Sequence, residues 1–294
     1  MGEYAIELHN VSKSFDDFSI RQLNLSVPKG YITGFIGPNG AGKSTTINLI
    51  MNLLTLDEGT IEVFGKDINE DGKAIRERIG FVYAENVFYD HLSIQLTEKL
   101  ISNFYKNWDT EVFNHYIERF HLPARKKVKD LSTGMKIKLF LSIALSHQAD
   151  VIILDEPTSG LDPVVRSEIL DILYEIIQDE NKTIFFSSHI TSDLEKIADY
   201  IVFIHDGEII MNDSKDNIME DYKIIKGSKD LLDRDTRSLL IGIEEKATGF
   251  VGMTRDSATF IELFGDRIIV EPATLDDVML YSIRKGGKAI ASFT

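Results

Sequence analysis

A glycine-rich segment near the N-terminus has the residue types and the spacing that bind phosphate. Gly37 and Gly42 are separated by four residues and are followed by Lys43 and Ser44, which matches the phosphate-loop pattern. Glycines allow backbone N–H groups to turn toward phosphate oxygens, while the lysine reaches the β- and γ-phosphates and the serine holds Mg²⁺. The residues that we expect to contact a nucleotide in this loop are Gly37, Pro38, Asn39, Gly40, Ala41, Gly42, Lys43, Ser44 and Thr45.

Two acids close an apolar run in the middle of the chain. Val151–Leu154 consists of four consecutive apolar residues, which is typical of a parallel strand buried on both faces. The carboxyl end of such a strand would place Asp155 beside Mg²⁺, and the adjacent Glu156 could polarise an attacking water as the catalytic residue. Two exposed acids at a strand end are the alternative interpretation, but the phosphate loop upstream favours the catalytic one.

The residues around these segments predict strands that alternate with helices. An apolar strand over 31–36 runs into the glycine-rich loop, and a helix follows from Lys43 to about Leu54. This context favours a phosphate loop over an incidental lysine in a glycine-rich turn. The other expected elements are strands at 4–8, 22–27, 151–154, 183–187 and 200–204, and helices at about 131–146 and 164–177. The alternation predicts an α/β fold with a mostly parallel sheet.

Two parts of the chain differ from this pattern. The stretch 93–121 is helical and rich in aromatic residues, and it belongs to a helical subdomain that we expect at about 86–148. After Asp213 the elements become shorter, and the last helix is expected at about 274–284. We therefore predict a first domain at 1–212 and a small α+β appendage at 213–294. The appendage has no histidine and no glycine-rich phosphate turn, so we expect it to serve dimerisation or regulation.

Further segments give the chain a family resemblance. Ser-Lys-Ser-Phe ends at Phe15, Leu-Ser-Thr-Gly-Met occupies 131–135, Ser-Gly-Leu-Asp occupies 159–162, and His189 follows the 183–187 strand. With the phosphate loop and the acidic strand end, these segments resemble the nucleotide-binding subunits of ATP-binding cassette (ABC) transporters, in the family's order. The resemblance implies a P-loop NTPase ABC cassette with a mostly parallel sheet core, an antiparallel β edge and a helical subdomain.

The resemblance also implies a role for individual residues. Phe15 would stack on adenine, and Ser132 and Gly134 would bind phosphate from the family's signature segment (131–135). Asp162 would belong to the D-loop (159–162), and His189 would be the switch histidine that joins Glu156 in catalysis. The simpler interpretations are a core position for Phe15, a helix N-cap for Ser132 and a local hydrogen bond for His189.

Glu85 departs from the family pattern, which has glutamine at this position after the strand at 80–83. In the family that glutamine touches Mg²⁺ and links the nucleotide site to the membrane partner. We expect Glu85 to be an additional, water-mediated ligand of Mg²⁺, and a surface pair with a lysine or arginine is the alternative. Met135 also replaces a polar residue of the signature segment, but the Ser132 hydroxyl and the Gly134 backbone are kept.

Composition narrows the function classes. The formal net charge of −15 disfavours a nucleic-acid partner, and the absence of cysteine excludes disulfides and thiol catalysis. No run approaches the roughly 18 uninterrupted apolar residues of a membrane span. The chain is therefore expected to work with separate transmembrane permease subunits, which would dock near Glu85 and the helical insert.

The resemblance thus implies an ATPase that uses ATP and Mg²⁺ and pairs with a second ABC subunit, as a homodimer or a heterodimer. It would lie at the cytoplasmic face of the cell membrane, held there by its transmembrane partners. Single cassettes with a short appendage resemble those of bacterial exporters of peptides, antibiotics or other hydrophobic cargo. A soluble ABC ATPase of the translation or DNA-repair type is the alternative.

Overall fold

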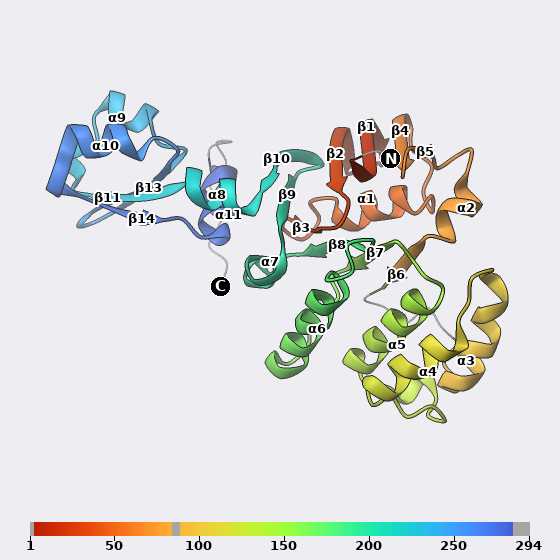
Figure 1. Ribbon diagram of the computed structural model, residues 1–294. Coiled ribbons are helices and arrows are strands. Elements are labelled where there is room, and N and C mark those ends of the chain that lie inside the picture. The colour runs from red at the N-terminus through yellow and green to blue at the C-terminus, as the bar shows by residue number, and fades with distance from the viewer. Residues whose placement is uncertain (1–2, 84–88, 285–294) are drawn as a thin grey trace. The chain divides into compact units, whose positions relative to one another are not determined.

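A six-stranded sheet carries the glycine-rich loop and the acidic strand end. The computed structural model describes residues 3–83 and 89–284, and the chain divides into two compact units, Met1–Asn212 and Asp213–Thr294. The sheet has the strand order β10–β9–β3–β8–β7–β6 (Figure 1). Its strands are β3 (Ile32–Ile36), β6 (Ile79–Val82), β7 (Val151–Asp155), β8 (Thr183–Ser188), β9 (Tyr200–His205) and β10 (Glu208–Ser214).

The central strands of this sheet run parallel, as the alternation of strands and helices predicted. β3 pairs with β8 and β9, and β7 pairs with β6 and β8, all in parallel register. The residues of β3 and β8 are buried throughout, as expected for central strands that are covered on both faces. Because parallel strands end at the same edge, the loops after β3, β7 and β8 emerge together. These loops carry the glycine-rich segment, Glu156 and His189.

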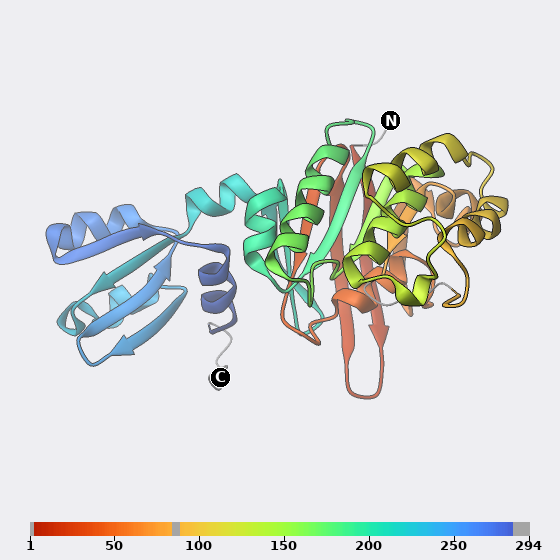
Figure 2. The same ribbon diagram turned by 90° about the horizontal axis from the view of Figure 1, so that it is seen from below.

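Helix α1 (Lys43–Ile50) lies between this parallel sheet and a second, antiparallel sheet. The antiparallel sheet contains β2 (Ser19–Pro28), β1 (Tyr4–Ser14), β4 (Glu58–Val63) and β5 (Lys66–Asp67) in that order, and β1 and β2 form a long hairpin (Figure 2). Apolar side chains from α1 and both sheets share one buried core. The sequence predicts that helix α1 extends to about Leu54, but the helix ends at Ile50. It ends there because Asn52 adopts a left-handed φ of 53° that turns the chain out of the helix.

Apart from α2, the other helices of the first unit lie on the opposite face of the parallel sheet or in the helical insert. α5 (Thr133–Ser146), α6 (Pro163–Ile176) and α7 (Thr191–Ile197) lie on the face away from α1 (Figure 1). The preceding elements are α2 (Gly72–Arg76), α3 (Ile94–Ile101), η1 (Ser102–Phe104), α4 (Thr110–Arg119) and η2 (Val128–Asp130). Within the described ranges, no helix has both the length and the apolar character needed to cross a bilayer.

The second unit folds around its own antiparallel sheet. The strand order is β12–β13–β11–β14, with β11 (Lys223–Gly227), β12 (Gly242–Lys246), β13 (Gly249–Thr254) and β14 (Ile268–Pro272). Helices α9 (Arg234–Ser238) and α10 (Ser257–Phe264) complete a β-α-β-β-α-β arrangement around a core that contains Ile225, Phe250 and Phe260. The remaining elements are α8 (Lys215–Asp221), η3 (Lys229–Leu231), η4 (Gly265–Arg267) and α11 (Leu275–Arg284). The unit is α+β, and its role in dimerisation or regulation stays a prediction.

Candidate functional site

The glycine-rich loop adopts backbone conformations that favour glycine. Gly42 is the N-cap of α1 with a φ of 112°, and Gly40 has a φ of 80°, both in a region that glycine adopts readily. A Cβ atom at Gly37 would lie 2.4 Å from the carbonyl oxygen of Ile204 in β9, so this position also requires glycine. The first turn of α1 contains no acidic residue that would compete with phosphate for its positive end.

Lys43 lies at the centre of a cluster of polar groups. Its ammonium group donates hydrogen bonds to the carbonyl oxygens of Gly37 at 2.7 Å and Pro38 at 3.2 Å. The same group lies 3.1 Å from Oε1 of Glu156, and the Lys43 side chain is only 5% exposed. Low exposure strengthens a charge pair relative to one in open water. The lysine is therefore held at the point where the loop would receive phosphate.

Glu156 is shared between Lys43 and His189. Its Oε2 lies 2.7 Å from Nδ1 of His189 and accepts a longer hydrogen bond, of 3.4 Å, from the His189 backbone N–H. Its Oε1 lies near Lys43 but is buried without a hydrogen-bond partner among the described residues. A buried acceptor of this kind can take a hydrogen bond from a water molecule in the site.

The backbone at Glu156 is strained, and a hydroxyl from the neighbouring strand holds it. Glu156 has a φ of 50°, which is rare for a residue with a side chain. Its N–H donates to Oγ of Ser187 at 3.0 Å, and that hydroxyl donates to Oδ1 of Asp155 at 2.7 Å. Backbone strain of this kind is concentrated at functional sites. Ser187, which the sequence did not single out, therefore positions both acids.

A pocket of about 510 Å³ extends from Lys43 and Glu156 to the turn of the β1–β2 hairpin. Sequence reasoning missed two of its residues, Asp17 and Phe18, although Phe18 is an aromatic residue shortly after Phe15. Phe15 is 44% exposed, and its ring stacks beside that of Phe18 with a centroid distance of 6.5 Å. The core interpretation of Phe15 is therefore wrong, and its exposed ring lies next to the pocket. The lining residues are Asp17, Phe18, Asn39, Gly40, Gly42, Lys43, Ser44, Thr45 and Glu156.

Several predicted residues do not line this pocket. Ser132 is the N-cap of α5, where its Oγ accepts a hydrogen bond from the Met135 N–H at 3.3 Å, so the N-cap interpretation is confirmed. Asp162 is the N-cap of α6, and Gly134 lies in the first turn of α5. Glu85 lies outside the described residues. The predicted residues that are not among the lining residues are Phe15, Gly37, Pro38, Ala41, Ser132, Gly134, Asp155, Asp162 and His189.

The oxygen donors near the pocket suit a metal that is bound mainly through its nucleotide. Among residues 3–83 and 89–284, no group of three or more His, Cys, Asp or Glu could hold a metal by itself. Mg²⁺ typically takes one or two protein ligands and completes its shell with phosphate and water. Ser44 and Asp155 offer such oxygens. Burial and the Asp155 carboxylate raise the pKa of Tyr83, so a neutral phenol lies beside this acid.

Comparison with known proteins places this site in a family. A family model described as ABC transporter matches residues 20–159. The bacitracin transport ATP-binding protein BcrA of Enterococcus faecalis is 34% identical to this chain, over 71% of the chain and 68% of its own length. The lantibiotic transport ATP-binding protein SrtF of Streptococcus pyogenes is 33% identical, over 73% of this chain and 94% of its own length.

Solved structures agree with these relatives. A structure of the ATP binding subunit of an ABC transporter superposes with a TM-score of 0.66 at 25% identity, over 73% of this chain and 91% of that one. The similarity thus extends from sequence to the arrangement of the strands that carry the glycine-rich loop and Glu156. The chain belongs to the ABC transporter family as an ATP-binding protein, and ATP hydrolysis is the activity of that family.

Proposed function

We propose that the chain is the ATPase subunit of an exporter and that it drives separate transmembrane permease subunits. The observation that carries this proposal is the position of Glu156, whose carboxylate lies between Lys43 and His189 beside the glycine-rich loop. A carboxylate within reach of the phosphate-binding lysine can polarise the water that attacks a phosphate.

In the proposed reaction, water attacks the γ-phosphorus of ATP and the bond to the leaving ADP breaks. Lys43 stabilises negative charge on the β- and γ-phosphates. Glu156 orients the water through Oε1, the oxygen that has no hydrogen-bond partner among the described residues. His189 contacts the other oxygen at 2.7 Å and so keeps the carboxylate oriented. Phe15 and Phe18 offer aromatic faces to the adenine ring.

One copy of the chain holds only part of the proposed site. Ser132 and Asp162 are exposed and, like Gly134, lie outside the pocket that contains Lys43. Ser132 caps α5, and helix N-termini bind phosphate. We therefore propose that a second ABC subunit, identical or different, brings these residues to the γ-phosphate. Hydrolysis would then require association of two subunits.

Mg²⁺ is the proposed metal, with Ser44 and Asp155 as its protein ligands and Glu85 as a further ligand through water. Bound Mg²⁺ would neutralise phosphate charge and polarise the γ-phosphoryl group. Ser44 is exposed and lines the pocket, and the hydrogen bond from Ser187 fixes the Asp155 carboxylate at the strand end.

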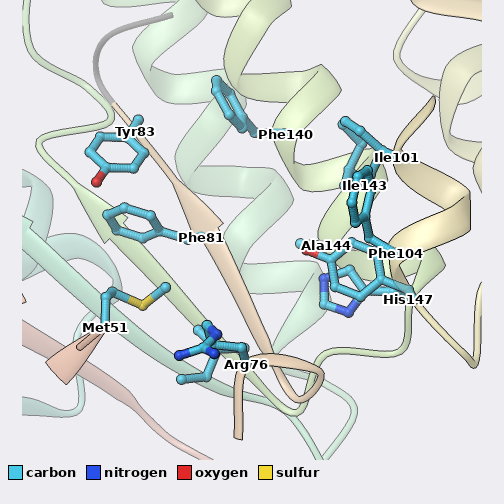
Figure 3. Close-up of a pocket in the computed structure, with 12 residues that line it drawn as sticks. Met51, Arg76, Phe81, Tyr83, Ile101, Phe104, Phe140, Ile143, Ala144 and His147 are labelled. Carbon is cyan, nitrogen blue, oxygen red and sulfur yellow. The ribbon is translucent and has the colours of Figure 1, made fainter. Parts of the chain in front are cut away.

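An apolar groove of about 330 Å³ between β6 and the helical insert is the proposed docking site for an apolar helix of the permease. Figure 3 shows Phe81 and Tyr83 on one side of the groove and Phe140 and Phe104 on the other. Phe104 is 73% exposed, so its ring is available to a partner. Tyr83, at the end of the described stretch after β6, also lines the groove.

The relatives indicate the class of cargo. BcrA and SrtF are named for transport of bacitracin and of lantibiotics. We infer that this chain powers export of a peptide, antibiotic or similar hydrophobic compound, from the cytoplasmic face of the membrane. Deleting its gene in the native host should lower the inhibitory concentration of bacitracin or of a lantibiotic. Unchanged inhibitory concentrations of both would contradict export of the cargo for which BcrA and SrtF are named.

Replacing Glu156 by glutamine tests the ATPase assignment directly. Glu156→Gln should keep ATP binding and lose turnover, because the phosphate contacts remain while the water loses its polarising carboxylate. It should also trap the associated form in ATP and Mg²⁺, visible by size-exclusion chromatography. Glu180→Gln, at an exposed acid of the same unit, is the matched control. Hydrolysis at the wild-type rate in Glu156→Gln would refute the assignment.

A further inference from the structure

A hydrogen-bonded cluster around the buried Asp193 carboxylate joins three segments of the proposed site. Asp193, near the start of α7, is 2% exposed and so is almost completely removed from solvent. Its Oδ2 accepts a hydrogen bond from the Thr158 hydroxyl at 2.7 Å, and its Oδ1 accepts one from Nε of Arg166 at 2.6 Å. Arg166 also donates to the Ser192 hydroxyl at 3.0 Å. One carboxylate therefore ties together the loop after β7, helix α6 and helix α7.

Each partner in the cluster lies a short distance along the chain from a residue of the proposed site. Thr158 is two residues after Glu156, Arg166 is four after Asp162, and Asp193 is four after His189. Backbone hydrogen bonds support each link: Ser159 N–H donates to the Glu156 carbonyl at 3.2 Å, and Arg166 N–H donates to the Asp162 carbonyl at 2.9 Å. The Asp193 N–H donates at 3.2 Å to the carbonyl of Ile190, the residue after His189. Moving Asp193 would therefore displace the segments that carry all three groups.

The charge of the cluster argues against a role in stability alone. Removing the Asp193 carboxylate from water is costly, while Arg166 stays partly hydrated with 27% of its side chain exposed, and an apolar residue of similar size often stabilises a fold at least as well. What such an ion pair adds is a fixed geometry, because its hydrogen bonds are short and directional. Glu156 already has a strained backbone, which persists only where its surroundings hold it.

We propose that Asp193 is a positioning residue that holds Glu156, the D-loop and His189 in one fixed arrangement through Thr158 and Arg166. The proposal rests on the ATPase function proposed above. Asp193 itself contacts none of the reacting groups. Its loss should therefore reduce turnover and leave the phosphate-binding contacts of the glycine-rich loop intact.

Steady-state ATPase assays of the full chain test this role. Asp193→Asn and Thr158→Val should each lower kcat by about 10-fold to 100-fold, because small misplacements of catalytic groups have effects of this size, and KM should stay near the wild-type value. Thr158→Ser keeps the hydroxyl and should keep the rate. Replacing the almost fully buried Asp193 carboxylate is destabilising, so Thr158→Val is the variant that decides if Asp193→Asn does not fold.

Two control variants separate positioning from general destabilisation. Asp171→Asn removes the exposed pair with Lys196, which joins the same two helices at 3.5 Å, and should change nothing. Ile169→Val trims a fully buried side chain of α6, and should lower the melting temperature without lowering kcat. A folded Thr158→Val or Asp193→Asn with wild-type kcat, or an equal loss of kcat in Ile169→Val, would overturn the proposal.

Hydrogen exchange distinguishes failure of this inference from failure of the ATPase assignment. Amides of 156–162 and 186–190 should exchange faster in Thr158→Val than in wild type or Asp171→Asn, whether or not ATP is hydrolysed. If the wild-type chain does not hydrolyse ATP but these amides still exchange faster in Thr158→Val, the proposed function is refuted and the positioning role of the cluster is kept. Unchanged exchange in Thr158→Val would refute the positioning role even where wild type hydrolyses ATP.

Discussion

Substitution of Gly134 tests whether the signature segment is constrained by packing, by ligand binding or by both. A Cβ atom at this position would lie 2.4 Å from Cγ1 of Val165 in α6, about 1 Å closer than an ordinary contact of 3.4 Å. Valine is stiff at χ1, so its methyl group cannot rotate away cheaply. Gly134→Ala must therefore push the first turn of α5 away from α6.

The expected cost follows from two opposing effects. Overpacking by one methyl group destabilises a core by about 1–3 kcal/mol, while replacing glycine by alanine in a helix stabilises it by up to about 1 kcal/mol. We expect Gly134→Ala to lower the free energy of unfolding of the first unit by about 1–2 kcal/mol. Val165→Ala removes the clashing methyl group, so the double variant should be no less stable than Val165→Ala alone.

Denaturant titration followed by tryptophan fluorescence measures this effect in the correct unit. The chain contains a single tryptophan, Trp108, which lies in the helical insert of the first unit next to Phe113. If Gly134 also approaches the phosphate of a second subunit, the double variant should recover stability but not ATPase activity. Wild-type stability in Gly134→Ala, or no relief from Val165→Ala, would refute the packing argument.

Three further perturbations have expected outcomes. Lys43→Ala should weaken ATP binding by roughly 2–4 kcal/mol, since phosphate charge would be left unpaired in a partly desolvated loop; unchanged affinity by calorimetry would contradict this. Burial lowers the pKa of His147 to about 4, so it is neutral in the folded chain. Because the unfolded chain binds this proton below about pH 6.5, His147 should cost up to about 3 kcal/mol of stability as pH falls from 6.5 to 4. His147→Phe should flatten that pH dependence, and an equally steep loss would contradict it. Glu85→Gln should narrow the gap between metal-free and Mg²⁺-bound ATP affinity; identical metal dependence would show that Glu85 does not act near the metal.

Local patterns were sufficient for the parts of the site that lie within one turn or one strand end. The spacing of Gly37, Gly42 and Lys43 predicts a phosphate loop because only neighbouring backbone groups are needed to form it. The apolar run before Asp155 predicts a buried strand for the same reason, and Ser132 caps α5 as its residue type suggests. The end of α1 at Ile50 was not predicted, because it depends on the left-handed backbone conformation of Asn52, which the apolar pattern does not report.

Contacts between distant segments were decided only by the tertiary structure. Glu156 meets Lys43 and His189 because parallel strands β3, β7 and β8 end at one edge of the sheet, and no pattern in a single segment reports which side chains meet there. Phe18 lines the pocket because the β1–β2 hairpin brings its turn to the glycine-rich loop. Asp193 and Thr158 are separated by 35 residues, so their hydrogen bond depends on how α7 packs beside the loop after β7. Residue type and spacing thus determined the chemistry available to this chain, and strand order determined which groups act together.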